Sequence, residues 1–160
     1  MGNQAANVLW GYGGNDRLSG DTGNDTLYGG SGSDRIYGGK GNDKLYGESG
    51  NDLLYAAAGA DRLNGGSGSD SFTFKALSDS TVAKSGRDTI FDFTAKSDRI
   101  DLSAIDANTS SAGDQAFVFV GSAAFGGKKG ELRYVRDVSD NLYLRRCERR
   151  QEGGFRDSPG

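Results

Sequence analysis

Residues 29–37 read Gly-Gly-Ser-Gly-Ser-Asp-Arg-Ile-Tyr, and residues 38–46 repeat the pattern as Gly-Gly-Lys-Gly-Asn-Asp-Lys-Leu-Tyr. The same spacing extends in both directions from this pair. Each copy has a Gly two residues before its Asp and a large apolar residue two residues after it. Columns held in phase in this way predict a repeat architecture rather than a flexible Gly-rich linker. The Asp column consists of Asp16, Asp25, Asp34, Asp43, Asp52, Asp61 and Asp70.

Each repeat predicts one short strand and one turn. The apolar residue points inward and its two neighbours point outward, so we expect a strand of about three residues. The preceding turn contains Gly, which permits positive φ and close backbone packing. Two repeats form one coil, and stacked coils bury a single file of apolar side chains between two parallel sheets. A degenerate eighth copy spans residues 2–10, with Asn7 in the Asp column and Leu9 in the apolar column.

The predicted fold is therefore all-β: a right-handed parallel β-roll over residues 1–73, closed by a C-terminal antiparallel β cap over residues 74–144. The periodicity stops after Phe74. Beyond it, we expect strands over residues 89–93, 99–102, 116–120, 131–135 and 141–144. A stacked array needs such a cap at its open end.

The regular carboxylates predict cation binding. Successive repeats face opposite edges of the roll, and coils about 4.8 Å apart bring like charges close together. Ca²⁺ takes about six to eight oxygen ligands from carboxylates and carbonyls, whereas Mg²⁺ demands a tighter octahedron. Ions between repeats n and n+2 give about five Ca²⁺ sites. The expected ligands are the seven Asp residues together with Gly11, Gly14, Gly20, Gly23, Gly29, Gly32, Gly38, Gly41, Gly47, Gly50, Gly65 and Gly68.

Some copies depart from the pattern. Residues 56–58 are Ala-Ala-Ala, so the sixth repeat lacks its first two glycines, and we expect its site, shared with the fourth repeat, to be the weakest. Tyr12, Asp21 and Glu48 replace the second Gly of three other copies. Two interpretations of Asp21 and Glu48 stay open: they add ligand charge, or they are simply solvated.

Composition excludes several function classes. The chain has no His among its 160 residues, which removes Ser-His-Asp and Cys-His catalysis and His-ligated zinc. One Cys cannot form an intramolecular disulfide, and no apolar run is long enough for a membrane span. Residues 1–73 carry five basic and nine acidic side chains, a balance that disfavours nucleic acid. Carboxylate pairs can hydrolyse glycosides, but the regular Asp residues are already explained as ligands, so we expect no enzyme activity.

The repeat pattern Gly-Gly-x-Gly-x-Asp-x-apolar-x resembles that of RTX (hemolysin-type) calcium-binding β-rolls. Residues 72–74 (Phe-Thr-Phe), 88–93 (Asp-Thr-Ile-Phe-Asp-Phe) and 98–106 (Asp-Arg-Ile-Asp-Leu-Ser-Ala-Ile-Asp) look like the C-terminal domain of serralysin-type metalloproteases. The R-modules of mannuronan C5-epimerases share this layout. The resemblance implies a non-catalytic Ca²⁺-binding module of a secreted bacterial protein. Such a module folds outside the cell, supports type I secretion and follows an upstream catalytic domain in the parent protein.

Four acidic residues of the flank, Asp88, Asp92, Asp98 and Asp101, allow two interpretations. They bind a further Ca²⁺, or they are solvated or hydrogen-bonded. Of the two, we expect the plain solvated or hydrogen-bonded role.

Residues 145–160 form an atypical basic tail with five Arg, the only Cys and the only Pro. We expect this tail to be disordered. One choice of codons, read in a frame shifted by one base, encodes Gly-Asp-Val-Asn-Gly-Asp, which resembles the segment that the family has here. The tail is therefore interpreted as a frameshifted end, and the alternative is a genuine basic tail that binds polyanions. No base is available to activate Cys147 as a nucleophile.

An alternative function is binding of an anionic, alginate-like polysaccharide by a module of an extracellular carbohydrate-active enzyme. Rows of Tyr beside cationic side chains suit a polyuronate, although Tyr also favours strands and packs in ladders. The candidate residues are Arg17, Arg35, Tyr37 and Tyr55 on one sheet, and Tyr28, Lys44, Tyr46 and Arg62 on the other.

Overall fold

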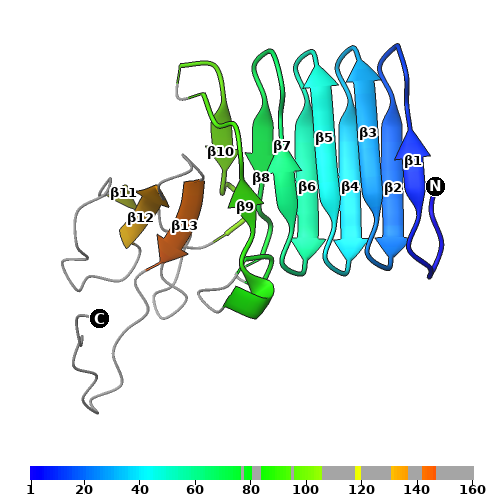
Figure 1. Cartoon of the computed structure of the whole chain (residues 1–160). Coiled ribbons are helices and arrows are strands. Elements are labelled where there is room, and N and C mark those ends of the chain that lie inside the picture. The colour runs from blue at the N-terminus through cyan, green and yellow to red at the C-terminus, as the bar shows by residue number, and fades with distance from the viewer. Residues whose placement is uncertain are drawn as a thin grey trace.

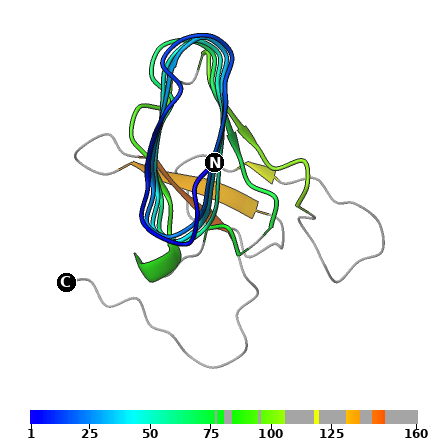
Figure 2. The ribbon, with the colours of Figure 1, turned by 90° about the vertical axis from the view of Figure 1, so that its right-hand side faces the viewer.

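The chain coils into a flat solenoid whose strands lie side by side along one axis, as the computed structural model in Figure 1 shows. The structure describes residues 1–76, 78–80, 84–94 and 96–105, and the backbone of strands at 118–119, 131–136 and 142–146. Odd-numbered strands of the roll form one sheet and even-numbered strands form the other. In the view along the axis, the coils superimpose as a narrow closed loop (Figure 2).

Sheet A is the sheet that contains the odd-numbered strands of the roll. Within the roll and its continuation, it contains β1 (Val8–Trp10), β3 (Thr26–Ser31), β5 (Lys44–Ser49), β7 (Arg62–Asn64) and β9 (Thr89–Ile90). Sheet B contains β2 (Arg17–Thr22), β4 (Arg35–Lys40), β6 (Leu53–Ala58), β8 (Ser71–Thr73) and β10 (Arg99–Asp101). All pairings among these strands are parallel. The predicted parallel roll is confirmed as an all-β solenoid of about four turns.

The strands of the roll are longer than the sequence predicted. β2 to β6 contain six residues each, where about three were expected. Identical coils stack in register, as the pairs Leu27–Leu45 and Ser31–Ser49 show, so the backbone also pairs through the glycines after each Tyr. The turns are correspondingly short. Gly41 shows what a turn demands, because its φ is +133° and an added Cβ would collide with the carbonyl of Gly23.

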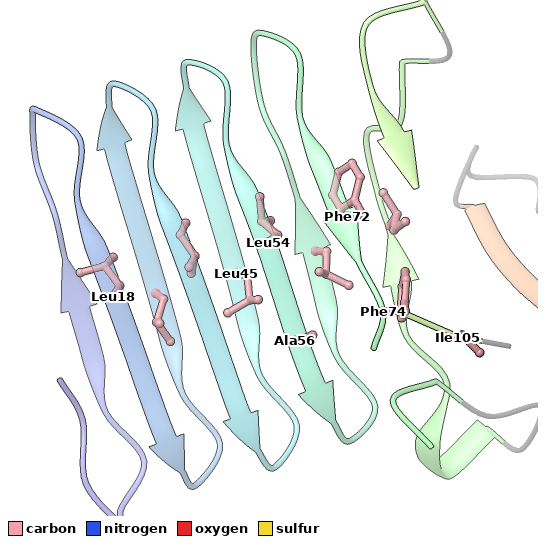
Figure 3. Packing of buried hydrophobic residues seen from close by; sticks show 11 residues of the cluster. Leu18, Leu45, Leu54, Ala56, Phe72, Phe74 and Ile105 are labelled. Carbon is pink, nitrogen blue, oxygen red and sulfur yellow. The ribbon is translucent and has the colours of Figure 1, made fainter. Parts of the chain in front are cut away.

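The core is the single file of apolar side chains that the spacing predicted (Figure 3). The file passes through the repeats from Leu18 to Phe72, and its side chains are 9% exposed or less. Burial of one Leu or Ile stabilises a fold by about 1.5–3 kcal/mol, so this file is the main apolar contribution of the roll. Phe74, Ile90 and Ile105 of the flank extend the same cluster. The members of the file are Leu18, Leu27, Ile36, Leu45, Leu54, Leu63 and Phe72.

The degenerate first copy adopts the coil geometry. β1 pairs with β3 in the register that places Leu9 beside Leu27. The amide of Gly2 donates to the carbonyl of Ser19 at 2.6 Å, as a residue of a regular coil would. The coil therefore tolerates Asn in the Asp column at this end of the roll.

The coil path continues where the nine-residue spacing ends. β9 pairs with β7 through Ile90 and Leu63, and β10 pairs with β8 through Ile100 and Phe72. The predicted strands 89–93 and 99–102 are thus present but shorter. They end early because Asp92 and Leu102 leave the ladder for the loops that follow.

Three further strands occur in the C-terminal part: β11 (Val118–Phe119), β12 (Glu131–Arg136) and β13 (Leu142–Arg146). β12 and β13 pair antiparallel, and β13 joins sheet A next to β9. Most of residues 106–160 lie outside the described part, as does the whole of the tail after 146. The cap and the interpretation of the tail therefore stay predictions. Within the described residues, no helix has the length and apolar character that a membrane crossing requires.

Candidate metal sites

The repeat carboxylates form two hydrogen-bonded files, one along each edge of the roll. The backbone N–H of Asp34 donates to Oδ1 of Asp52 at 2.8 Å, one coil further on, and Asp16 donates in the same way to Asp34 at 2.7 Å. On the opposite edge, Asp25 donates to Asp43 at 2.8 Å and Asp43 to Asp61 at 2.7 Å. Neighbours in each file are repeats n and n+2, as expected from two repeats per coil.

The second oxygen of each carboxylate has no partner. Oδ2 of all seven repeat Asp residues is buried and accepts no hydrogen bond. From Asp25 onward, the Asp residues of the roll are no more than 2% exposed. Burial of a carboxylate oxygen without a hydrogen-bond donor or a cation is strongly unfavourable. Each of these carboxylates therefore requires a positively charged partner next to its Oδ2.

In the first five repeats, a carbonyl oxygen of the next coil lies beside the orphaned oxygen. A Cβ built on Gly29 would touch both Oδ2 of Asp34 and, at 2.8 Å, the carbonyl oxygen of Gly47. Gly38 has the same relation to Asp43 and to the carbonyl of Ala56. Only glycine leaves this space open, and two oxygens border it. The first glycines of the repeats that contact their own Asp are Gly11, Gly20, Gly29, Gly38, Gly47 and Gly65.

The remaining candidate glycines have a different position. They lie in the turns with φ between +110° and +136°, and most pack against a carbonyl of the preceding coil. Their conformation shapes the turn around the carboxylate. These glycines are Gly14, Gly23, Gly32, Gly41, Gly50 and Gly68.

Side chains alone do not assemble a metal site. Among the described residues, no group of three or more Asp, Glu, Cys or His side chains gathers closely enough to hold an ion. Any ion must therefore take most of its ligands from backbone carbonyls. Ca²⁺ accepts carbonyl oxygens in this way, so the oxygens present fit it.

Sequence reasoning missed a second ladder of amide side chains. Oδ1 of Asn15 accepts from the amide of Ser33 at 2.7 Å, and Oδ1 of Asn51 accepts from Ser69 at 2.8 Å. Asn42 makes the same bond to Ala60 on the other edge. Each Asn side chain accepts from an amide of the next coil, whereas each Asp side chain accepts from an amide of the previous coil. The sequence does contain a pattern that predicts this ladder, because Asn directly precedes Asp in several repeats.

The irregular repeat places a methyl group at a first-glycine position. Ala56 is 1% exposed and stands where the other repeats have the glycine that contacts the carboxylate. Ala57, next to it, has φ of 71°, which strains a residue with a Cβ. Both features fit the expectation that this repeat holds the weakest site. Asp21 and Glu48 are exposed, and Oδ1 of Asp21 accepts from the hydroxyl of Ser19 at 2.9 Å.

Of the four flank carboxylates, Asp88 and Asp98 each accept from the last amide of a file, and Asp88 alone also keeps a buried oxygen without a partner. Its Oδ1 accepts from the amide of Asp61 at 2.9 Å, and its Oδ2 is buried without a partner. Both oxygens of Asp98 are used, by the amides of Asp70 and Thr94. Asp92 accepts from two backbone amides, and Asp101 accepts from Ser103. Hydrogen bonding thus accounts for three of the four residues.

Burial perturbs the carboxylates of the files. Burial raises the pKa of Asp43 and of Asp52 from the ordinary 3.8 to about 6, and nearby carboxylates of the same file add to the rise. The pKa values of Asp61 and Asp88 are also raised, mainly by burial and further by a neighbouring negative charge, that of Asp43 on Asp61 and that of Asp61 on Asp88. The raised pKa values mean that the ionised carboxylates of the files are not balanced by nearby positive charge.

The candidate glycan residues pack with one another. The rings of Tyr28 and Tyr46 stack at 4.9 Å with 8° between planes, and Trp10 stacks on Tyr28 at 3.9 Å. On sheet B, the Arg17 guanidinium lies 4.6 Å from the ring centre of Tyr37. The Lys75 ammonium lies 4.4 Å from the ring centre of Tyr55. These contacts are those of a structural ladder.

A polar groove runs along the edge of sheet B. Its volume is about 360 Å³. Arg35, Leu53, Ser71 and Arg99, four neighbours in register on successive strands, line it together with turn residues such as Asn51. The Arg99 Nε–H donates to the Ser71 hydroxyl at 3.1 Å.

Comparison with known proteins gives matches to the repeats and to a structure. The RTX calcium-binding nonapeptide repeat model matches four times, over residues 1–27, 10–45, 19–54 and 37–72. No curated protein sequence matches significantly. Among solved structures, the AlgE6R3 subunit of the Azotobacter vinelandii mannuronan C5-epimerase is similar, with 32% identity and a TM-score of 0.50. The match covers 82% of this chain and 70% of that one. The chain belongs to the family of RTX calcium-binding repeat modules.

Proposed function

We propose that this chain is a non-catalytic module that folds when Ca²⁺ binds along the two edges of its roll. RTX repeats bind Ca²⁺. The observation that carries the proposal for these residues is the row of buried Oδ2 atoms without partners, five of them beside a carbonyl oxygen of the next coil. The proposed ligands are the seven repeat Asp carboxylates and the carbonyls of the repeat glycines.

Neighbouring carboxylates of one file define the proposed sites. Asp16, Asp34, Asp52 and Asp70 give three pairs on one edge, and Asp25, Asp43 and Asp61 give two on the other. The orphaned oxygen of Asp88 supports one more site, next to Asp61. Bound Ca²⁺ supplies the positive charge that the buried carboxylates lack.

The energetic consequence is coupling of binding to folding. Without a cation, each coil adds buried carboxylate oxygens that have lost their water and gained no donor. The single-file core is too thin to offset many such penalties. The sites exist only when coils are stacked, so the free energy of binding becomes free energy of folding. Cytosolic Ca²⁺ is scarce, and extracellular Ca²⁺ modules bind with Kd of about 10⁻⁴–10⁻³ M.

This coupling suits export. RTX modules are typical of secreted bacterial proteins. We place the roll at residues 1–73 and its β cap at 74–144, with the basic tail at 145–160 as a separate segment. In the parent protein, a chain unfolded in the cell would pass a type I transporter and fold outside. The folded module would then serve the catalytic domain upstream of it.

Titration calorimetry on the full chain tests the proposal. Ca²⁺ should bind with saturation at millimolar concentration, at about five to six ions per chain. Mg²⁺ in excess should neither replace the signal nor compete strongly, because it retains its waters. Saturation at one or two ions would show that the files of carboxylates are not a row of sites.

A second candidate function is binding of an anionic polysaccharide, and the groove on sheet B favours it. Arg35 has no carboxylate partner within the described residues, and register places Arg99 three strands away from it. At about 4.8 Å per strand, the Cα atoms of the two residues lie about 14 Å apart. The lining between them consists of hydroxyl and amide side chains, Leu53 and three file carboxylates, whose negative charge the proposed Ca²⁺ would offset. The three carboxylates are those of Asp34, Asp52 and Asp70. The similar solved structure is part of an enzyme named for mannuronan.

Variants can distinguish polysaccharide binding in the groove of sheet B from binding along the Tyr row of sheet A. Short alginate oligomers should bind the Ca²⁺-loaded chain, and Arg35→Gln should weaken that binding at least severalfold. Lys44→Gln on sheet A is the matched control and should bind as the unaltered chain does. Equal losses in both variants would point to unspecific charge attraction, and no binding at all would remove the candidate.

A further inference from the structure

Asn64 is the only Asn of the chain that precedes a Gly. In an Asn-Gly sequence, the backbone nitrogen of Gly can attack the side-chain amide carbon of Asn, because Gly has no Cβ to obstruct the approach. Asn64 ends β7, and Gly65 is the first glycine of the last regular repeat. The sequence therefore places a chemically labile bond inside a proposed Ca²⁺ site.

The folded chain shields this bond. The amide N–H of Gly65 donates to Oδ1 of Asp92 at 2.9 Å, and the N–H of Gly66 donates to Oδ2 of Asp92 at 2.6 Å. One carboxylate thus holds the proton that the attacking nitrogen must lose. Asn64 also pairs with Tyr46 in the ladder of sheet A, which fixes the extended backbone around it. Attack on the Asn side chain requires a different backbone angle, so the bond must leave the ladder first.

We propose that Asn64–Gly65 is a deamidation site that the folded roll closes and the unfolded chain opens. The nitrogen of Gly65 forms a bond to Cγ of Asn64, the Cγ–Nδ2 bond breaks, and ammonia leaves with the amide proton. One water then hydrolyses the succinimide ring at either carbonyl. The product is either an ordinary aspartate with a normal backbone, or isoaspartate, in which the main chain runs through the former side chain.

Isoaspartate at this position prevents correct refolding. It adds one methylene to the main chain directly before Gly65, where even an added Cβ would collide with the carboxylate of Asp70. A longer backbone at this point shifts the coil relative to its neighbours, and register cannot change gradually in a ladder. The fraction of chains that can still refold therefore falls with the time that the protein spends unfolded. The coupling to Ca²⁺ rests on the proposed function, whereas the chemistry at Asn64 does not.

The experiment incubates the full chain at mildly alkaline pH in Ca²⁺, in chelator and in urea. Peptide mass mapping and isoaspartate labelling then follow Asn64. In urea, Asn64 should react faster than every other Asn, and Ca²⁺ should slow the reaction at least about tenfold. Asp92→Asn should raise the rate in Ca²⁺ severalfold. Asn64→Gln, which closes a ring only slowly, should retain Ca²⁺-dependent refolding after the same incubation.

The three incubation conditions distinguish a failure of this inference from a failure of the proposed function. If Asn64 is no faster than other Asn residues in urea, or if Asn64→Gln loses refolding as quickly as the unaltered chain, the inference is wrong. If Asn64 reacts quickly in urea and equally slowly in Ca²⁺ and in chelator, the site stands and Ca²⁺-driven folding fails.

Discussion

The backbone N–H of Asp61 donates a hydrogen bond of 2.9 Å to a carboxylate oxygen of Asp88, 27 residues further along the chain. Within the roll, the same bond spans 18 residues, as between Asp43 and Asp61. The file of carboxylates thus continues after the regular repeats have ended. Asp61 therefore has a carboxylate neighbour on both sides, Asp43 and Asp88.

Removal of the Asp88 carboxylate should remove one Ca²⁺ site. Asp88→Asn keeps the hydrogen-bonding shape but loses the charge, so the Ca²⁺ stoichiometry measured by equilibrium dialysis should fall by about one. Asp98→Asn is the matched control, because both oxygens of Asp98 already accept hydrogen bonds from backbone amides. Unchanged stoichiometry in Asp88→Asn would restrict the sites to the regular repeats.

Restoration of glycines in the sixth repeat should strengthen its site. Ala56→Gly removes the buried methyl from the side of the coil that faces the carboxylate in other repeats. Ala57→Gly relieves a residue held at φ of 71°, a change that stabilises by about 1 kcal/mol. The double variant should fold at lower Ca²⁺ concentration, as measured by titration with far-ultraviolet circular dichroism. A higher midpoint would mean that the alanines are favourable where they stand.

Truncation of the apolar file should destabilise the Ca²⁺-loaded roll strongly. Leu45 is fully buried in the centre of the file, and Leu45→Ala should lower the free energy of unfolding by about 2–5 kcal/mol. Val8→Ala at the exposed first strand should change it by less than about 0.5 kcal/mol. Denaturant unfolding at fixed Ca²⁺ provides the comparison. Similar losses in both variants would contradict a single-file core.

Acid should partly replace Ca²⁺. The pKa of Asp43 and of Asp52 is raised to about 6 in the folded chain and returns to 3.8 on unfolding. A raised folded-state pKa means that the Ca²⁺-free fold binds protons more tightly, so its stability is fully present below 3.8 and is lost as pH rises through about 6. In chelator, β signal should therefore increase from pH 7.5 toward about pH 4.5. A decrease over that interval would show that the buried carboxylates do not control folding.

The sequence was sufficient to predict the roll because each column has one physical role. The apolar column from Leu18 to Phe72 predicted the core, and the Asp column predicted the two edge files. Local periodicity also identified the degenerate coil that contains Asn7, which donates to Asp25 as a regular repeat would. The strand lengths were underestimated, because pairing between stacked coils depends on the neighbours and not on one repeat.

Features that depend on loops were beyond the spacing argument. Asp88 enters the file after a connection of 27 residues, whereas the 18-residue step of the roll leads from Asp61 to Asp79. The partner of Asp92 is the Gly65–Gly66 backbone, which nothing in the local sequence around residue 92 specifies. The groove on sheet B similarly combines Arg35 with Arg99 from a strand outside the repeats.

Circular dichroism of the full chain at neutral pH, with and without Ca²⁺, tests the central claim most directly. After exhaustive chelation, residues 11–73 should be largely disordered, because their buried carboxylates have no positive partner. Millimolar Ca²⁺ should produce the β spectrum, and the same concentration of Mg²⁺ should not. A β spectrum that is unchanged by chelation would contradict the claim that Ca²⁺ binding along the two edges folds the roll.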